Sequence, residues 1–210
     1  MKKINLSLII LLALTSCAQE SGDSQIENSE VPQLKDAQVA YFASGCFWCV
    51  EAIFESVKGV QEAVSGYAGG EKVNPTYSEI SSGKTKHAET VKVYYDSSVV
   101  SFNILLDVFF NSHDPSTLNQ QGPDYGPQYR SIAFYSNEYE LEVIRKKISS
   151  LIEAQKFAKI TTEVSPINVF YKAEEYHQDY ERNHPENSYV QSVSIPRLNA
   201  FKKRMPEVLK

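Results

Sequence analysis

The alternation of hydrophobic and polar residues predicts strands along much of the chain. In residues 88–95, Val91, Val93 and Tyr95 fall on one face, which is typical of a half-buried strand. The run 39–43 is short and apolar, as expected of a buried strand. Further strands are predicted at 60–67, 131–135, 161–165 and 168–170.

Apolar residues also recur at helical spacing. Residues 101–111 carry a compact apolar stripe that includes Leu105, Leu106 and Phe109, and a longer stripe predicts a helix over 137–158. Further helices are predicted at 50–57, 173–182 and 197–203, and long loops rich in Gly, Pro and polar residues at 71–86 and 113–130. Strands and helices mix without strict alternation. The sequence therefore predicts an α+β fold, a mainly antiparallel or mixed sheet with helices packed on it.

The first 36 residues follow a different pattern. Lys2 and Lys3 precede the apolar run 4–14, which is too short to span a bilayer comfortably and is typical of a secretory signal sequence. The run ends in Leu-Thr-Ser-Cys17, which resembles the lipobox of bacterial lipoproteins, where the cysteine receives lipid. We predict a signal peptide over 1–16, a lipidated Cys17 with a flexible tether over 17–36, and a folded domain over 37–210.

This pattern predicts a protein that is exported and lipid-anchored to a bacterial membrane, on its periplasmic or cell-surface face. The alternative is an ordinary cleaved signal sequence in which Cys17 is incidental. No other contact with a membrane is expected.

Composition narrows the class of protein. The chain is 42% hydrophobic and 22% charged, which is typical of a globular domain. Its net charge is -5, and loss of residues 1–16 would remove two lysines and leave -7. No basic patch dominates, so a nucleic-acid partner is not expected. Only two cysteines remain in the predicted domain, which indicates redox or metal chemistry and not a disulfide scaffold.

Both cysteines lie in Gly45-Cys46-Phe47-Trp48-Cys49, at a predicted strand-to-helix junction. Free backbone N–H groups at the helix start are expected to point at the Cys46 sulfur and to lower the pKa of its thiol. The adjacent aromatic side chains suit a small apolar substrate that bears one polar group. The alternative is an inert cysteine at a helix start, with Phe47 and Trp48 in the core.

Two loop segments supply further candidate residues. Glu89 follows Gly83-Lys84-Thr85-Lys86-His87-Ala88, and the segment 122–131 contains Asp124 and Tyr129. Taken singly, a solvated strand carboxylate, a turn-forming aspartate and a packed tyrosine would be ordinary. Together with Cys46 they supply a nucleophile, a carboxyl proton donor and a phenolic hydrogen-bond donor. These groups suit attack on a polar X=O bond.

These segments, with 65–70, Asn74-Pro75-Thr76-Tyr77 and His113-Asp114-Pro115, resemble the peptide methionine sulfoxide reductase A family over residues 39–204. On this basis we expect a catalytic domain at 37–210 with a ferredoxin-like two-layer core and long active-site loops. Cys46 corresponds to the nucleophile that attacks the sulfoxide sulfur, and Glu89 to the acid that protonates its oxygen. The other implied substrate-binding residues are Phe47 and Trp48 around the methyl group, Tyr77 and Tyr129 at the oxygen, and Asp124 in support.

The resemblance also implies the reaction. The family reduces the S epimer of methionine sulfoxide, in proteins and free, and leaves a sulfenic acid on the cysteine. This acid is the first, reversible step of cysteine oxidation. A disulfide then forms and a thioredoxin-like dithiol reduces it, in repair of proteins after oxidative stress. We expect no bound cofactor and no metal, and a monomer.

The sequence departs from the common family pattern at the resolving cysteine. Val190 stands where many relatives have that cysteine, and Cys49 stands where many have glycine. Residues three apart at a helix start have Cα atoms about 5–6 Å apart, within reach of a disulfide. We therefore predict that Cys49 resolves the sulfenic acid of Cys46. The alternative is a buried, packing Cys49 and reduction by an external thiol.

Two other functions are alternatives to this interpretation. Cys46-Phe47-Trp48-Cys49 is a C-x-x-C motif, as in thioredoxin-type thiol–disulfide oxidoreductases, but the intervening proline and a convincing βαβ unit are missing. A lipoprotein with a metal site would use Cys46, Cys49, His177 and His184. The two histidines are seven residues apart, which is outside the usual zinc spacing.

Overall fold

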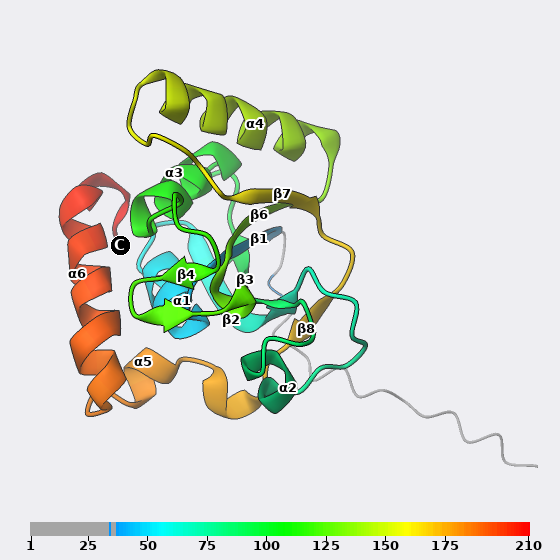
Figure 1. Ribbon diagram of the computed structural model, residues 1–210. Coiled ribbons are helices and arrows are strands. Elements are labelled where there is room, and N and C mark those ends of the chain that lie inside the picture. The colour runs from blue at the N-terminus through cyan, green and yellow to red at the C-terminus, as the bar shows by residue number, and fades with distance from the viewer. Residues whose placement is uncertain (1–33, 35–36) are drawn as a thin grey trace, which may run out of the picture. The chain divides into compact units, whose positions relative to one another are not determined.

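The computed structural model describes residue 34 and residues 37–210 (Figure 1). The predicted signal peptide, Cys17 and most of the predicted tether lie outside the described residues. Within the described part of the chain, no helix is both long and apolar enough to cross a membrane.

A six-stranded sheet forms the centre of the domain, in the order β7-β6-β1-β3-β2-β8. Strand β7 runs parallel to β6, and every other neighbouring pair is antiparallel. The strands are β1 Gln38–Ser44, β2 Val60–Ala68, β3 Ala88–Tyr95, β6 Ser131–Tyr135, β7 Glu163–Pro166 and β8 Phe170–Lys172. A separate small hairpin pairs β4 Gln120–Gln121 with β5 Asp124–Tyr125.

Within residues 37–210, six α-helices accompany the sheet (Figure 1). They are α1 Phe47–Glu55, α2 Tyr77–Ser81, α3 Phe102–Ser112, α4 Glu138–Glu153, α5 Tyr180–Asn183 and α6 Ile195–Arg204. The chain order β1-α1-β2-β3-α3-β6 with the sheet order β6-β1-β3-β2 is the ferredoxin-like βαββαβ arrangement. The predicted α+β class and its ferredoxin-like core are therefore confirmed.

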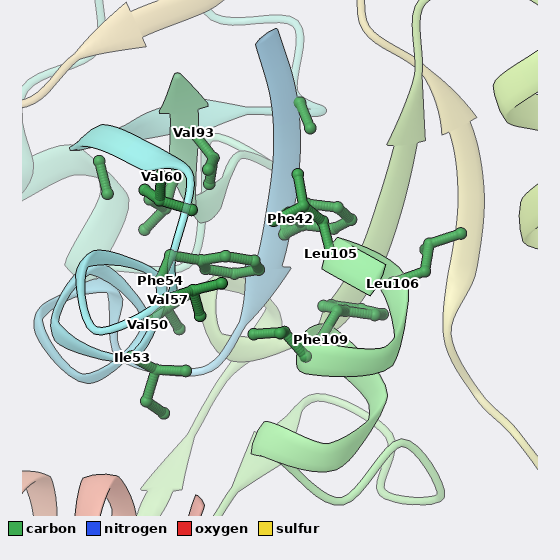
Figure 2. Packing of buried hydrophobic residues seen from close by; sticks show 14 of the residues in the cluster. Phe42, Val50, Ile53, Phe54, Val57, Val60, Val93, Leu105, Leu106 and Phe109 are labelled. Atoms are coloured by element: carbon green, nitrogen blue, oxygen red, sulfur yellow. The ribbon is translucent and has the colours of Figure 1, made fainter. Parts of the chain in front are cut away.

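Aromatic side chains fill the layer between the sheet and helices α1 and α3 (Figure 2). Phe42 of β1 stacks on Phe54 of α1 with ring centroids 5.0 Å apart, and it also contacts Phe102 and Phe109 of α3. Burial of each such ring stabilises the fold by about 1.5–3 kcal/mol. Met205, at the end of α6, joins this core with 7% of its surface exposed. The contacts of Phe42 with α1 and α3 thus fix the position of β1, and with it the turn into α1.

The C-terminal third differs most from the sequence prediction. The helix predicted at 173–182 is wrong: the structure has a 3-10 turn at Glu175–His177 and then the four-residue α5. Asp179 between them adopts a left-handed conformation with φ 54°. Such a residue cannot continue a helix.

Other element boundaries also differ. The helix predicted at 137–158 ends at Glu153, and Gln155 has φ 52°. The predicted loop 71–86 contains α2, which a capping box of Thr76 and Glu79 begins. The loop 113–130 contains the β4–β5 hairpin and a 3-10 turn at Pro127–Tyr129. The last helix begins at Ile195, after a π-helical turn at Val190–Ser194.

Candidate active site

Cys46 lies at the junction between β1 and α1, where it is the N-cap residue of the helix. Gly45 makes the turn with φ 92°, a conformation that favours glycine. A Cβ atom on Gly45 would also lie 2.6 Å from Gln121 Cβ. The turn places Cys46 at the edge of a pocket, with 6% of its surface exposed.

Glu89 on β3 lies at the same pocket, with 2% of its surface exposed. Its Oε2 accepts a hydrogen bond from the backbone N–H of Phe47 over 3.0 Å. Burial raises the pKa of Glu89 to about 8 against the lowering effect of that bond, and the charge of Asp124 adds to the rise. The carboxyl group is therefore mostly protonated at neutral pH, with Oε1 free of the Phe47 bond and available to carry the proton.

The pocket itself has a volume of about 350 Å³ and gathers the predicted substrate-binding residues from five elements. Tyr77 begins α2, Asp124 belongs to β5, and Tyr129 ends the 3-10 turn that precedes β6. The lining residues are Cys46, Phe47, Trp48, Tyr77, Glu89, Asp124, Tyr129, Asn187, Ser188 and Tyr189.

The aromatic wall of the pocket is fixed by its own contacts. Trp48 stacks on Tyr180 with ring centroids 3.7 Å apart, and its Nε1–H donates to Nδ1 of His177 over 3.2 Å. The Phe47 ring packs against His177 with centroids 5.0 Å apart. An indole held in this way presents one face at a set angle to whatever enters the pocket.

Two phenols complete the polar side of the pocket. Burial, with the nearby charge of Glu89, raises the pKa of Tyr77 to about 12 and also raises the pKa of Tyr129. Both hydroxyls therefore stay protonated and can donate hydrogen bonds to an oxygen atom in the pocket.

Sequence reasoning missed Asn187, Ser188 and Tyr189 as pocket residues. The Tyr189 hydroxyl donates to Oδ2 of Asp124 over 2.6 Å, so it ties the C-terminal segment to the β4–β5 hairpin. The signal was available, because this segment matches the one that carries the resolving cysteine in many relatives. Val190, which is fully buried, stands in place of that cysteine. Without a cysteine at this position, its neighbours were not recognised as pocket residues.

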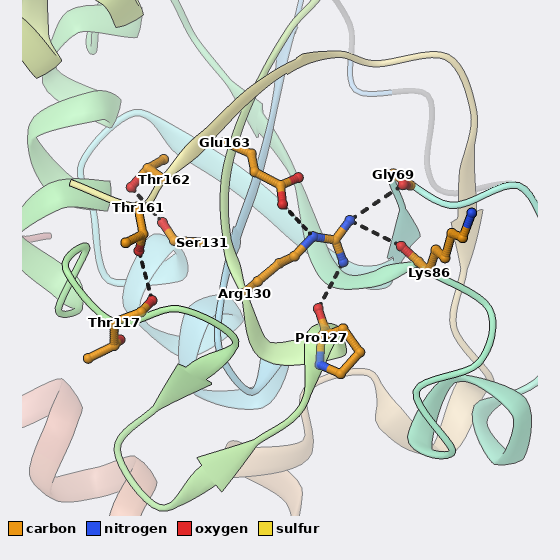
Figure 3. Close-up of polar contacts among 9 residues, drawn as sticks. All are labelled: Gly69, Lys86, Thr117, Pro127, Arg130, Ser131, Thr161, Thr162 and Glu163. Carbon is orange, nitrogen blue, oxygen red and sulfur yellow. Dashed lines mark hydrogen bonds and ion pairs between the residues drawn. The ribbon is translucent and has the colours of Figure 1, made fainter.

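Arg130 is a second omission. Its guanidinium joins three backbone segments around the site (Figure 3). Nη1 donates to Pro127 O over 2.8 Å, Nη2 donates to Lys86 O over 3.0 Å and to Gly69 O over 3.4 Å, and Nε pairs with Glu163 over 3.1 Å. These contacts fix the turn that carries Tyr129 against the loops that flank Glu89. We call this group the Arg130 clamp.

The pKa of Cys46 differs from the sequence-based expectation. The Cys46 side chain receives no capping hydrogen bond, and the N–H of Phe47, the first residue of the helix, donates to Glu89. Burial raises the pKa of Cys46, whereas a hydrogen bond from Cys46 and the charge of Arg197 lower the pKa of Cys49 to about 6. The prediction of a lowered pKa at Cys46 is therefore wrong. Of the two thiols, Cys49 is thus the easier one to deprotonate.

Cys49 does not line the pocket, although it lies one turn into α1 with 1% of its surface exposed. Both Cys46 and Cys49 are free thiols in this structure. The hydroxyl oxygen of Ser194 lies 3.1 Å from Cys49 Sγ. Cys49 thus faces Cys46 on one side and the C-terminal segment on the other.

The cysteines and histidines of the metal alternative do not form a metal-spaced cluster in the described part of the chain. Nδ1 of His177 is occupied by Trp48, and Nδ1 of His184 lies 3.2 Å from Tyr180 O. Among residues 34 and 37–210, the one cluster spaced to hold a metal ion consists of Glu51, Glu55 and Asp179, and it includes neither cysteine.

Comparisons with known proteins agree with this geometry. The family model described as peptide methionine sulfoxide reductase matches residues 38–208. Peptide methionine sulfoxide reductase MsrA of Pasteurella multocida is 47% identical over 173 residues, which cover 82% of this chain and 99% of that protein.

Solved structures give the same result. Mxr1 from Saccharomyces cerevisiae in reduced form matches with a TM-score of 0.68 and 36% identity, over 72% of this chain and 87% of that one. Mxr1 in complex with Trx2 matches with a TM-score of 0.50 and 28% identity, over 69% and 84%. The C-x-x-C motif therefore lies in a fold shared with these reductases. The chain belongs to the peptide methionine sulfoxide reductase family, and it is an enzyme that acts on methionine sulfoxide.

Proposed function

We propose that this enzyme reduces the S epimer of methionine sulfoxide, free and in proteins, with Cys46 as nucleophile and Glu89 as acid. The observation that carries the proposal is the hydrogen bond from Phe47 N to Glu89. It fixes a buried carboxyl group, protonated at neutral pH, beside the only cysteine that lines the described pocket.

The first step balances with these groups alone. The Cys46 thiol passes its proton to Cys49, and its sulfur attacks the sulfoxide sulfur while Glu89 protonates the oxygen. The oxygen then moves to the Cys46 sulfur as the bond between the two sulfurs breaks. The products are methionine, reduced by two electrons, and a Cys46 sulfenic acid, oxidised by two.

The residues that line the pocket support selection of one epimer. The hydroxyls of Tyr77 and Tyr129 bind the sulfoxide oxygen, and the Trp48 ring holds the methyl group. Fixing these two substituents while Cys46 attacks the sulfur leaves a single direction for the rest of the substrate. Only one configuration at sulfur satisfies all three contacts.

The second step is resolution by Cys49. Its thiolate attacks the sulfenic sulfur, a Cys46–Cys49 disulfide forms, and the oxygen leaves as water. The three-residue separation between Cys46, the N-cap residue of α1, and Cys49 in its first turn supports this step. A thioredoxin-like dithiol then reduces the disulfide, as the complex of the similar Mxr1 with Trx2 supports.

The test uses the reduced protein, one equivalent of each separate epimer of a methionine sulfoxide peptide, and no reductant. We expect methionine from the S epimer alone, a protein mass lower by two hydrogens, and no dimedone adduct. Cys46→Ser should yield no methionine, because an alcohol lacks the reactivity of a thiolate. Cys49→Ser should accumulate a dimedone adduct on Cys46.

Two results would contradict the proposal. Methionine from Cys46→Ser would exclude its role as nucleophile. A wild-type protein that traps dimedone stoichiometrically would assign Cys49 to packing.

We also propose that Cys17 carries lipid and anchors the enzyme to a bacterial membrane on its periplasmic or cell-surface face, where it repairs oxidised proteins. The support is the sequence of residues 1–17. Labelled palmitate should enter the wild-type protein and not Cys17→Ala. Label that persists in the variant would refute the anchor.

A further inference from the structure

Cys49 has no direct route to solvent for its proton. Only 1% of its surface is exposed, and it does not line the substrate pocket. A thiol must lose its proton before it attacks, because the thiolate is the nucleophile. In the proposed first step Cys49 also receives the proton of Cys46. A path that removes this proton is therefore needed before the second step.

We propose that Ser194 and Glu181 form a proton relay that removes the proton of Cys49 and delivers it to solvent outside the substrate pocket. This inference deepens the proposed function and rests on Cys49 being the resolving cysteine.

The geometry of Ser194 carries the proposal. Its hydroxyl oxygen lies 3.1 Å from Cys49 Sγ and 2.6 Å from Glu181 Oε2, and the residue is fully buried. A hydroxyl has one proton to donate, so it cannot donate to both partners at once. Two arrangements satisfy every group. In one, the Cys49 thiol donates to Ser194 and Ser194 donates to the Glu181 carboxylate.

In the other arrangement, a protonated Glu181 donates to Ser194 and Ser194 donates to the Cys49 thiolate. The two arrangements differ by the transfer of one proton along a chain of two short contacts. The transfer moves one negative charge from Glu181 to Cys49, where the nearby charge of Arg197 stabilises the thiolate.

Glu181 provides the exit. It is half-buried and lines a second pocket of about 200 Å³, to which Cys46 and Glu89 do not contribute. Trp48 lines both pockets. Burial raises the pKa of Glu181, which favours its taking up a proton. The proton can therefore leave on a different side of Trp48 from the one where substrate binds.

The backbone places these groups together. Ser194 ends the π-helical turn Val190–Ser194, immediately before α6, and Glu181 lies in α5. Both α5 and α6 contact α1, which carries Cys49 (Figure 1). Single π-helical turns occur often at functional sites. Here the π-helical turn brings the Ser194 hydroxyl to the buried side of α1, next to Cys49.

Other titratable or charged groups face the relay. Around Cys49 these are Cys46, Tyr189 and Arg197, whose guanidinium donates to Ser44 O over 2.8 Å and to Ser112 O over 2.9 Å. Lys202 acts on Glu181 by its charge. The remaining charged residues of the second pocket are Glu51, Glu55, Asp179 and Arg182. Among the described residues, Ser194 alone hydrogen-bonds both ends of the proposed path.

The relay step balances. The proton of Cys49 moves to Ser194 as the proton of Ser194 moves to Glu181. The Cys49 thiolate then forms a bond to the sulfur of the Cys46 sulfenic acid, and the sulfur–oxygen bond breaks. The oxygen takes a proton from Glu89, once solvent has reprotonated that carboxyl, and leaves as water. Glu181 releases its proton to solvent.

The experiment separates the two half-reactions. The reduced protein is mixed with one equivalent of the sulfoxide peptide and quenched over time, and methionine and disulfide are measured in the same samples. The variants are Ser194→Ala and Glu181→Gln; the amide of Gln can hydrogen-bond but cannot hold the transferred proton. Exposed neighbours give matched controls, Ser192→Ala and Glu186→Gln.

We expect disulfide formation to slow about 10²-fold in both variants, at the lower end of the span for positioned proton transfer. Methionine release should slow far less, and dimedone should trap the sulfenic acid that accumulates. The rise of the disulfide rate with pH should move to higher pH, because Cys49 must then lose its proton without help. The control variants should match the wild type in both steps.

Three results would overturn the relay. The first is disulfide formation in Glu181→Gln and Ser194→Ala with the rate and pH profile of the controls. If Ser194→Ala does not fold, Glu181→Gln on the pocket surface decides alone. A wild-type protein that makes methionine but no disulfide would refute the role of Cys49 and the relay with it. A wild-type protein that makes no methionine would refute the proposed function itself.

Discussion

Glu89 and Glu51 are two buried glutamates near the cysteine-bearing helix, and they look alike by burial and charge. Each has 2% of its surface exposed, and burial raises the pKa of each to about 8. Glu89 accepts from the N–H of Phe47 at the start of α1. Glu51, within α1, bonds the hydroxyl of Ser65 and the N–H of Asp179.

The neighbours of the two carboxyl groups differ. Glu89 shares its pocket with a sulfur atom and two phenols, whereas the pocket lined by Glu51 adds the carboxylates of Glu55 and Asp179 and no thiol. Glu51 instead holds the left-handed residue Asp179, where α5 begins. A raised pKa therefore marks a buried carboxyl, and only its surroundings make it a catalytic acid.

Replacing the Glu89 carboxyl should give the largest effect. Glu89→Gln keeps a group of the same shape but removes the proton, so methionine formation should slow by about 10²–10⁴-fold. In the wild type, activity should fall as pH rises through about 8, because the acid is then ionised. This alkaline decline should be absent in Glu89→Gln. Single-turnover rates across pH measure both effects, and an unchanged rate and profile would remove Glu89 from the mechanism.

Loosening the Arg130 clamp should have a smaller effect on the same pocket. Arg130→Lys keeps the charge but cannot reach Pro127, Lys86 and Gly69 together. The turn that carries Tyr129 should then lose its fixed position, and kcat/KM should fall about 10-fold, since small misplacements near the reacting atoms slow catalysis. Arg145→Lys, on the exposed surface of α4, is the control. Wild-type kinetics in Arg130→Lys would show that the clamp does not position the phenol.

Replacing Glu51 should change activity least. Glu51→Gln should turn over substrate nearly as the wild type does, but it should alter how stability depends on pH. The folded-state pKa of Glu51 lies above its ordinary value of 4.5, at about 8. The contribution of Glu51 to the free energy of unfolding is therefore complete below the ordinary pKa and is lost as pH rises through about 8.

Urea unfolding between about pH 5 and about pH 9 tests this expectation. As pH rises, the free energy of unfolding of the wild type should fall by up to about 1.4 kcal/mol more per pH unit than that of Glu51→Gln. The control is Glu153→Gln, which is exposed at the end of α4. Equal slopes in Glu51→Gln and the wild type would show that Glu51 is not protonated in the fold, and a large loss of turnover would end its contrast with Glu89.

Much of the fold was accessible from sequence because local patterns determine it. The alternation in 88–95 and the stripe in 101–111 correspond to β3 and α3, and Gly45 correctly marked the turn before Cys46. The segment after β8 failed for a physical reason. There, Asp179 is held in its left-handed conformation by a bond to Glu51, 128 residues away in sequence. No local pattern records such a contact.

The candidate site divides in the same way. Motif residues such as Glu89, Tyr77 and Tyr129 do converge on Cys46, since strand ends and loops meet at one pocket. Arg130 and Ser194 could not be recognised, because their importance lies in contacts with the backbone of distant loops and with Cys49. The pKa of Cys46 was misjudged because burial, which the sequence does not display, raises it.

The burial of Met205 also bears on how the enzyme survives the conditions that create its substrate. It is the one methionine among the described residues, and it is enclosed by the core with 7% of its surface exposed. Little methionine sulfur is accessible to oxidants on the described domain. One enzyme molecule is therefore a poor substrate for another. Damage by excess peroxide should then begin at the catalytic sulfur, as overoxidation beyond the sulfenic state. The enzyme's working lifetime would be set by how quickly that state is discharged.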